Sequence, residues 1–122
     1  MEVRKEPAAG LTQSVADARR KPRFNLDVEI RIDSRTAGVL KGRTVDISES
    51  GISAMLTLEV PIGEFVELQF GLPFGPATVY ATVRQRNAFR YGFQFVESHS
   101  AHELIQASCN WLSVRQSLNR VR

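Results

Sequence analysis

Apolar and polar residues alternate strictly at the start of the ordered part of the sequence. One face of the segment carries Leu26, Val28, Ile30 and Ile32. The other face carries Asp27, Glu29, Arg31 and Asp33. Successive side chains of a strand point to opposite faces, so this period of two predicts a half-buried antiparallel strand over residues 26–33.

Five more segments have the period of a strand. They cover residues 39–47, 52–58, 65–70, 79–83 and 91–95. Turn signals separate these segments: Thr36-Ala37-Gly38, the loop 71–76 and Arg86-Asn87-Ala88. The prolines of the loop are expected to keep it out of any central strand, and Gly42 is a candidate β-bulge. Six short strands joined by turns indicate a β-barrel or a sandwich.

The period changes to that of a helix near residue 100. Ser100 and Glu103 have the spacing of a capping box, which predicts a helix start. One predicted stripe then holds Leu104, Ile105, Ser108, Trp111, Leu112 and Leu118. We expect this helix to close over the barrel, with Trp111 in the core and fraying from about residue 119.

The length of 122 residues is that of one domain with its own core, which we place at residues 19–118 after a flexible leader, 1–18. No apolar run approaches the roughly 20 residues of a membrane span. The N-terminus lacks the apolar segment of a secretory signal, so we expect a cytoplasmic protein. The single cysteine, Cys109, is expected to be a buried apolar residue rather than a nucleophile.

Positive charge is concentrated at the two ends of the chain. Residues 1–23 hold six Lys/Arg and three acids, and residues 113–122 hold three Arg and no acid. The segment between them holds seven basic and ten acidic residues. Proteins that bind nucleic acid usually spread cations over one face to contact the phosphate backbone. This distribution argues against DNA or RNA and favours a small anionic ligand captured by a basic arm.

Two polar motifs are candidates for that capture. Asp46-Ile47-Ser48-Glu49-Ser50-Gly51 lies between two predicted strands, and Arg19-Arg20-Lys21-Pro22-Arg23 precedes the first strand. Residues two apart on an extended segment point the same way, so Asp46 and Ser48 can present a carboxylate and a hydroxyl to one ligand. The alternative is a turn whose polar groups satisfy only their own backbone, next to a solvated basic run.

Both motifs together resemble those of the PilZ domain family. In that family an RxxxR motif precedes the first strand, as residues 19–23 do here, and a DxSxxG motif follows the second strand, as residues 46–51 do here. Tyr91-Gly92-Phe93-Gln94-Phe95 in the last strand is also similar to that family. The resemblance implies a six-stranded antiparallel β-barrel with a C-terminal α-helix and a flexible basic N-terminal arm. It also implies binding of the bacterial second messenger cyclic di-GMP. The implied ligand-binding residues are Arg19, Arg20, Arg23, Asp46, Ser48 and Gly51.

The chemistry of these residues agrees with that implication. A guanidinium can donate two hydrogen bonds to guanine O6 and N7, or bind phosphate. The guanine N–H groups need an acceptor, which Asp46 or Ser48 can supply, and Gly51 allows a close backbone approach. We expect the arm to fold over ligand that rests on the barrel and to pass the change to a downstream protein partner or a fused domain.

Other functions have less support in the sequence. No triad, phosphate-binding loop or metal-ligand spacing is evident, so neither an enzyme nor a metal site is expected, and no cofactor besides the ligand. A PilZ-fold protein-interaction domain without nucleotide is the main alternative. Binding of single-stranded nucleic acid would depend on Tyr80 and Phe89. Arg84, Arg86 and Arg90 are interpreted as strand-edge residues outside the site.

Overall fold

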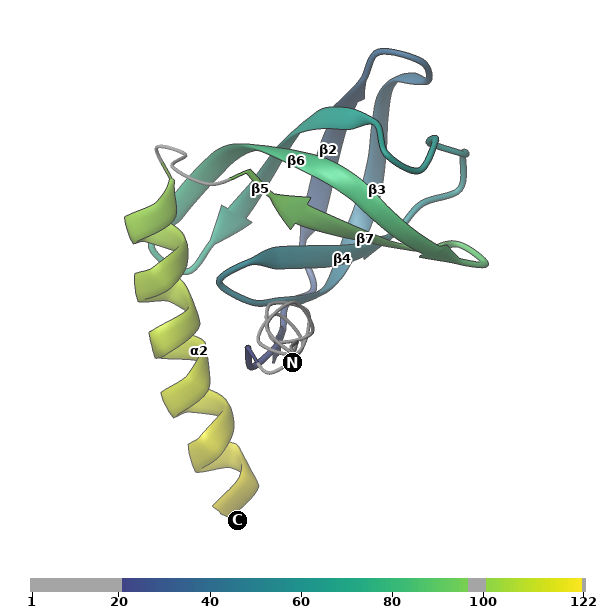
Figure 1. Ribbon diagram of the computed structural model, residues 1–122. Helices are drawn as coiled ribbons and strands as arrows, with labels where there is room; N and C mark the ends of the chain where they lie inside the picture. Colours follow the sequence, from purple (N-terminus) through teal and green to yellow (C-terminus); the bar gives the residue numbers. More distant parts are fainter. Residues whose placement is uncertain (1–20, 97–100, 122) are drawn as a thin grey trace, which may run out of the picture.

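The computed structural model describes residues 21–96 and 101–121 and is mainly β, with one C-terminal helix. Figure 1 shows a closed barrel with the helix α2 along one side. The strands and the helix are β1 (Phe24–Asn25), β2 (Glu29–Ser34), β3 (Gly38–Ile47), β4 (Gly51–Met55), β5 (Phe65–Leu72), β6 (Gly75–Asn87), β7 (Arg90–Phe95) and α2 (His102–Val121). No helix in this described part of the chain is both long and apolar enough to cross a membrane.

Antiparallel pairing closes six of the strands into a barrel. The order is β3-β2-β5-β6-β7-β4, and β4 pairs with β3 to complete the circle. The short strand β1 adds to the outside of this circle by pairing Phe24 with Ile47 and Asn25 with Asp46. The six-stranded antiparallel barrel with a C-terminal helix is therefore confirmed.

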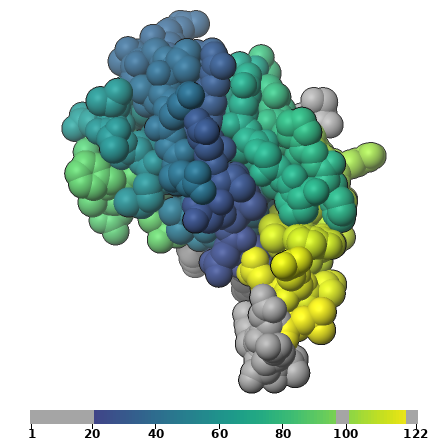
Figure 2. Space-filling model, turned by 180° about the vertical axis from the view of Figure 1, so that it is seen from behind, coloured from purple at the N-terminus to yellow at the C-terminus, as the bar shows by residue number. Residues whose placement is uncertain are grey.

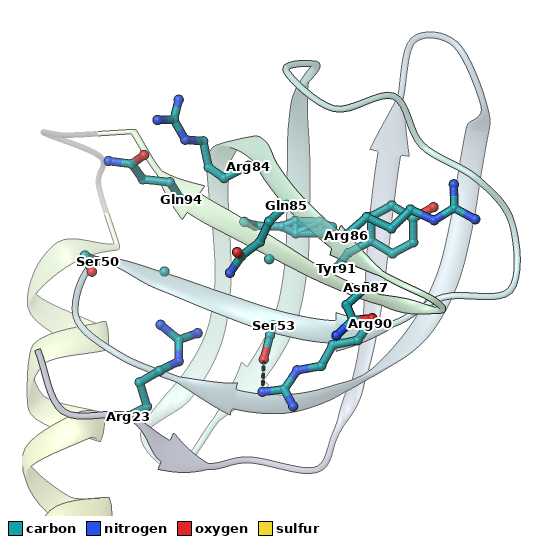
Figure 3. Close-up of a pocket in the computed structure, with 13 residues that line it drawn as sticks. Arg23, Ser50, Ser53, Arg84, Gln85, Arg86, Asn87, Arg90, Tyr91 and Gln94 are labelled. Atoms are coloured by element: carbon teal, nitrogen blue, oxygen red, sulfur yellow. Dashed lines mark hydrogen bonds between the residues drawn. The ribbon is translucent and has the colours of Figure 1, made fainter. Parts of the chain in front are cut away.

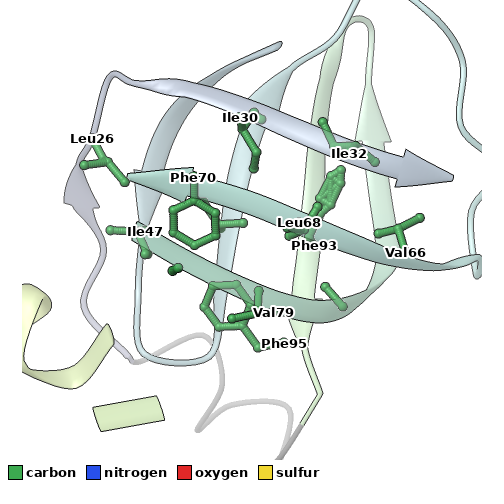
Figure 4. Close-up of a cluster of buried hydrophobic side chains, with 14 of the residues drawn as sticks. Leu26, Ile30, Ile32, Ile47, Val66, Leu68, Phe70, Val79, Phe93 and Phe95 are labelled. Carbon is green, nitrogen blue, oxygen red and sulfur yellow. The ribbon is translucent and has the colours of Figure 1, made fainter. Parts of the chain in front are cut away.

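The apolar side chains of the alternating pattern fill the inside of the barrel. In β2, Ile30 and Ile32 are fully buried and the residues between them are exposed. Side chains from every strand of the barrel meet them there, as Figure 4 shows for part of this core. The inward positions of β2–β7 supply this apolar core, which holds the strand register because a slip of one residue would expose it.

The segment before β2 runs along β3 without being a regular strand. The predicted strand 26–33 begins only at Glu29. Leu26 and Val28 instead exchange backbone hydrogen bonds with β3, and the Thr44 hydroxyl accepts one from the Val28 amide at 2.9 Å. This attachment fixes the direction in which the chain enters the barrel, and so it positions Arg23.

Helix α2 packs on the barrel and on β1. Asn25 and Gln116 exchange two hydrogen bonds, at 3.3 and 3.1 Å. The C-terminal half of α2 extends past the barrel (Figure 1), and the space-filling view from behind shows the same projection in yellow (Figure 2). The helix therefore links the entry segment beside Arg23 to a surface away from the barrel.

Three sequence predictions about turns and bulges are wrong. Gly42 pairs regularly with Ile30, and the bulge between β3 and β4 lies at Val45 instead. Gly42 is required for another reason, since a Cβ there would lie 2.4 Å from the Met55 carbonyl oxygen. A period-two pattern does not distinguish a glycine needed for close packing from a glycine that forms a bulge.

Strands β5 and β6 are longer than predicted. The expected loop 71–76 is largely part of the β5–β6 hairpin, in which Pro76 pairs with Gly71. Proline is tolerated there because it is the second residue of its strand, next to the turn. At the other end, β6 includes Arg86 and Asn87, and the turn comes at Ala88, whose φ of 58° is unusual for alanine.

Two residues of the predicted helical stripe lie outside the core. Ile105 and Leu112 are buried against the barrel as expected, and so is Cys109. Trp111 and Leu118 are exposed by 38% and 62%, so their placement on the core stripe is wrong. The predicted cap, Ser100, lies outside the described residues, and the leader and tail boundaries stay predictions.

Candidate functional site

Asp46 is the centre of a charged cluster on the outside of the barrel. The bulge at Val45 places Asp46 directly opposite Ser53 of β4, and the Ser53 hydroxyl donates to Asp46 Oδ1 at 2.6 Å. Two nitrogens of Arg23 contact the same oxygen. Nε donates a hydrogen bond to it at 2.9 Å, and a terminal guanidinium nitrogen lies 2.9 Å from it. Arg90 donates to Oδ2, also at 2.9 Å. Both oxygens of one carboxylate are thus held by arginines that lie 67 residues apart in sequence.

The environment of Asp46 keeps it ionised. Its side chain is only 16% exposed. Burial alone would raise the pKa of this carboxyl, but the hydrogen bonds from Ser53 and Arg23 and the charges of Arg23 and Arg90 hold it below the ordinary value of 3.8. Asp46 is therefore an acceptor at neutral pH.

Replacing Ser53 with alanine should raise the pKa of Asp46, because one hydrogen bond to the charged form is lost. A carboxyl whose pKa is lower in the folded than in the unfolded state stabilises the fold above its unfolded pKa, and this stabilisation is lost as the pH falls through the folded pKa. The variant should therefore begin to unfold in acid at a higher pH. A carbon-detected NMR titration of the Asp46 carboxyl gives the midpoint directly, and an unchanged midpoint would contradict the assigned role of Ser53.

Ser48 shapes the turn that follows Asp46. The Ser48 residue is fully buried, and its Oγ accepts hydrogen bonds from the Ser50 and Gly51 amides, each at 3.2 Å. The Arg23 guanidinium also reaches this oxygen, at 3.5 Å. The hydroxyl thus satisfies its own turn and meets the arginine, so it is not open to a ligand in this arrangement.

Gly51 is required by the packing of two strands. A Cβ at this position would lie 2.4 Å from the backbone oxygen of Phe93 in β7. The sequence predicts that Gly51 allows a close backbone approach, and the approaching group in the structure is this carbonyl. Gly51 therefore holds β4 against β7 and fixes the end of the turn.

An open groove of about 770 Å³ lies beside the Asp46 cluster. Its walls come from β4, β6, β7 and the entry segment (Figure 3). Four arginines line it: Arg23, Arg84, Arg86 and Arg90. Within the described residues, Arg84 has no ion-pair partner, whereas Arg86 contacts Glu59 at 3.3 Å and lies over the Tyr91 ring. The groove is of the size of small-molecule sites and favours an anionic ligand.

The structure brings together three of the six predicted site residues. Arg23 contacts both Asp46 and Ser48, and Gly51 ends the turn that Ser48 begins. Arg19 and Arg20 lie outside the described residues, so their placement stays a prediction. Among residues 21–96 and 101–121, no group of three His, Cys, Asp or Glu side chains could hold a metal ion.

The arginines of the β6–β7 hairpin were missed as members of the cluster. Arg84, Arg86 and Arg90 line the groove, and Arg90 directly contacts Asp46. The sequence shows two arginines at the end of β6, but a β-bulge at Arg84 interrupts the alternation there, so that Arg86 lies opposite Tyr91. The sequence does not show that β7 pairs with β4, which is the contact that brings Arg90 to Asp46.

Comparison with known proteins identifies the family of the chain. The PilZ domain profile matches residues 17–111. No curated protein matches the chain significantly by sequence.

Several solved structures share the fold. The PilZ domain of YcgR from Escherichia coli, solved with c-di-GMP, is 15% identical with a TM-score of 0.66, over 84% of this chain and 95% of that chain. The Bacillus subtilis inhibitor of motility MotI/DgrA is 21% identical with a TM-score of 0.68, over 84% of this chain and 53% of that chain. MrkH of K. pneumonia in its apo state is 15% identical with a TM-score of 0.68, over 83% of this chain and 53% of that chain. The present chain thus spans about half the length of the last two proteins. Since the profile covers most of its length, the chain belongs to the PilZ domain family.

Proposed function

We propose that this chain is a receptor for cyclic di-GMP in bacterial second-messenger signalling, in the cytoplasm. The observation that carries the proposal is the contact of Arg23 with both Asp46 and Ser48. It joins the two motifs at one point on the barrel surface, next to a groove lined by four arginines. The PilZ domain of YcgR, which shares the fold, was solved with c-di-GMP, and this supports the choice of ligand.

The ligand would replace hydrogen bonds that the side chains of the site make with one another. Asp46 accepts hydrogen bonds from Arg23, Arg90 and Ser53, and guanine offers N1–H and N2–H₂ donors that can take some of these places. The released guanidiniums can then donate to the guanine O6 and N7 acceptors or to the two phosphates. Every charged group keeps a partner in this exchange, so little energy is lost to unpaired polar groups.

The remaining groups act as supports and as further contacts. Ser48 would hold the turn and orient Arg23 rather than contact the ligand while the turn stays closed. Arg84 and Arg86 extend the positive surface along the groove, where they can meet the second phosphate. Arg19 and Arg20 of the arm would close over the bound ligand, and the change would pass to a downstream partner or fused domain.

Replacing Asp46 with asparagine should weaken cyclic di-GMP binding about tenfold or more, because one acceptor for guanine N–H groups becomes a donor. Competition against a fluorescent cyclic di-GMP measures the loss, with GTP and cyclic GMP as competitors that should not displace the probe. Asp27→Asn is the matched control, since Asp27 also pairs with an arginine, Arg43, at 3.0 Å but lies outside the groove. Equal affinity of both variants and the wild type would exclude Asp46 from the site. Displacement by GTP at the same concentration would contradict the ligand class.

A further inference from the structure

Helix α2 carries two separate apolar faces. The first packs on the barrel through buried residues: Ala101, Ile105, Ser108, Cys109 and Leu112. The second, which we call the outer seam, consists of Leu104, Ala107, Trp111, Val114 and Leu118. At 100° per residue the outer seam lies roughly a third of a turn from the barrel face. Within residues 21–96 and 101–121, packing on the barrel therefore accounts for the first face and leaves most of the outer seam exposed.

The outer seam is apolar, and it is exposed from Ala107 to Leu118, whereas Leu104 is half-buried against the edge of the core. Trp111, Val114 and Leu118 are exposed by 38%, 60% and 62%. Phe74, 55% exposed, meets Trp111 edge-on with ring centroids 6.2 Å apart, and so extends the seam onto the β5–β6 hairpin. Contiguous exposed apolar surface of this kind marks an interaction site rather than a solvated face.

The spacing of the outer seam identifies the shape of its partner. Its residues follow one another at intervals of three, four, three and four, which is the a/d pattern of a heptad repeat. Leu104, Trp111 and Leu118 take the a positions, and Ala107 and Val114 take the d positions. Such a seam is complementary to another helix with the same repeat, because a and d side chains insert between four residues of the facing helix.

We propose that the outer seam pairs with the outer seam of a second copy of this chain in antiparallel orientation. Antiparallel pairing places a residues opposite d residues. Trp111 then faces Val114 of the second copy, and Ala107 faces Leu118 of the second copy, so that a large side chain meets a smaller one in each layer. Parallel pairing would instead place Trp111 against Trp111 and Ala107 against Ala107, which overfills one layer and leaves a void in the next.

The position of α2 in the fold allows this arrangement. The C-terminal half of the helix projects past the barrel (Figure 1), so in an antiparallel pair each barrel lies beside the projecting end of the other copy's helix. The groove lies on β4, β6 and β7, and the outer seam contributes none of its lining residues. Pairing of the helices thus leaves the groove open. The dimer proposal depends on the helix alone and is independent of the proposed ligand.

Sedimentation velocity over a range of concentrations tests the dimer with the full 122-residue chain. The seam supplies five residues per copy, fewer than the roughly 20 residues a side of a stable interface, so we expect reversible, concentration-dependent dimers. Leu118→Glu should make the protein monomeric at every concentration tested. Gln106→Glu, which adds the same charge at an exposed c position on the side of α2 away from the seam, should dimerise as the wild type does. A wild type that stays monomeric at NMR concentrations, or a Leu118→Glu variant that still dimerises, would overturn the proposal.

Disulfide trapping tests the orientation. In a Cys109→Ala background, the double variant Ala107→Cys/Leu118→Cys should form a covalent dimer on mild oxidation, because the two positions face each other across antiparallel helices. Ala107→Cys alone should stay largely reduced. Rapid dimer formation by this single variant would show parallel helices and would refute the antiparallel arrangement. The Cys109→Ala background removes the natural thiol, which is a weak nucleophile even in the wild type because burial and the nearby Glu49 raise its pKa to about 11.

Discussion

Replacing Arg23 with alanine should weaken cyclic di-GMP binding by about ten- to a hundredfold, the effect of losing one good bidentate guanidinium contact at roughly 1–3 kcal/mol. Arg23 is the residue that joins the two motifs, since it contacts both Asp46 and Ser48. Its loss removes a ligand contact and also the group that holds the entry segment against the turn. Calorimetric titration of the variant and the wild type measures the difference.

Arg43 provides a matched control for Arg23. It contacts Asp27 through Nε and a terminal nitrogen, each at 3.0 Å from the same carboxylate oxygen, which is the geometry that Arg23 has with Asp46. Arg43→Ala should bind cyclic di-GMP like the wild type because Arg43 does not line the groove. Arg43→Ala should keep nearly wild-type stability, as expected for an exposed ion pair, whereas Arg23→Ala also loses a contact to Asp46, whose side chain is only 16% exposed. Equal affinities of the two variants would remove Arg23 from the site.

Replacing Gly51 with alanine should destabilise the fold by about 1–3 kcal/mol or more, because the added methyl overpacks a close contact. The new Cβ would lie 2.4 Å from the Phe93 carbonyl oxygen, which belongs to the backbone of a paired strand and cannot rotate away. Urea unfolding monitored by circular dichroism measures the change. Relief of the clash must separate β4 from β7, so the turn from Ser48 to Gly51 should also shift and ligand binding should weaken.

Gly71→Ala is the control that distinguishes this steric effect from the general effect of replacing a glycine in a strand. A Cβ at Gly71 meets no atom within 4 Å, and Gly71 also lies in a paired strand, β5. Gly71→Ala should therefore be neutral or stabilise the fold by up to about 1 kcal/mol, through the smaller entropy of the unfolded chain. A Gly51→Ala variant as stable as Gly71→Ala would mean that β4 and β7 are not in the close contact described here.

The strands could be predicted because burial on one face imposes a period of two. Ile30 and Ile32 are buried where the alternation places them, and the helix begins close to where the period changes. The bulge at Val45 could not be predicted, because it depends on how β3 and β4 are aligned across the barrel. The pairing of Pro76 was missed for a related reason: its place next to a two-residue turn makes a proline acceptable.

The helix was predicted with one apolar stripe, and it has two. Buried and exposed apolar residues look alike in a sequence, so Trp111 and Leu118 were grouped with Ile105 and Leu112. The two faces can be distinguished only by which residues pack against the barrel in the structure. The heptad spacing of the outer seam is visible in the sequence, but it has meaning only once the barrel face has been assigned.

The candidate site was predicted in its local parts and missed in its long-range part. Asp46 and Ser48 lie close in sequence, and their joint placement follows from the turn. Arg90 reaches Asp46 because β4 pairs with β7, and no local pattern encodes that pairing. The role of Gly51 was expected to concern a ligand, whereas the close approach is made by the protein's own backbone.

Calorimetric titration of cyclic di-GMP into the wild-type chain tests the central claim most directly, because it needs neither a probe nor a variant. The joined Arg23–Asp46 cluster and the arginine-lined groove predict a saturable heat of binding at micromolar ligand, absent with cyclic GMP and GTP. No saturable heat at high micromolar cyclic di-GMP would contradict the claim and favour a PilZ domain that works without nucleotide.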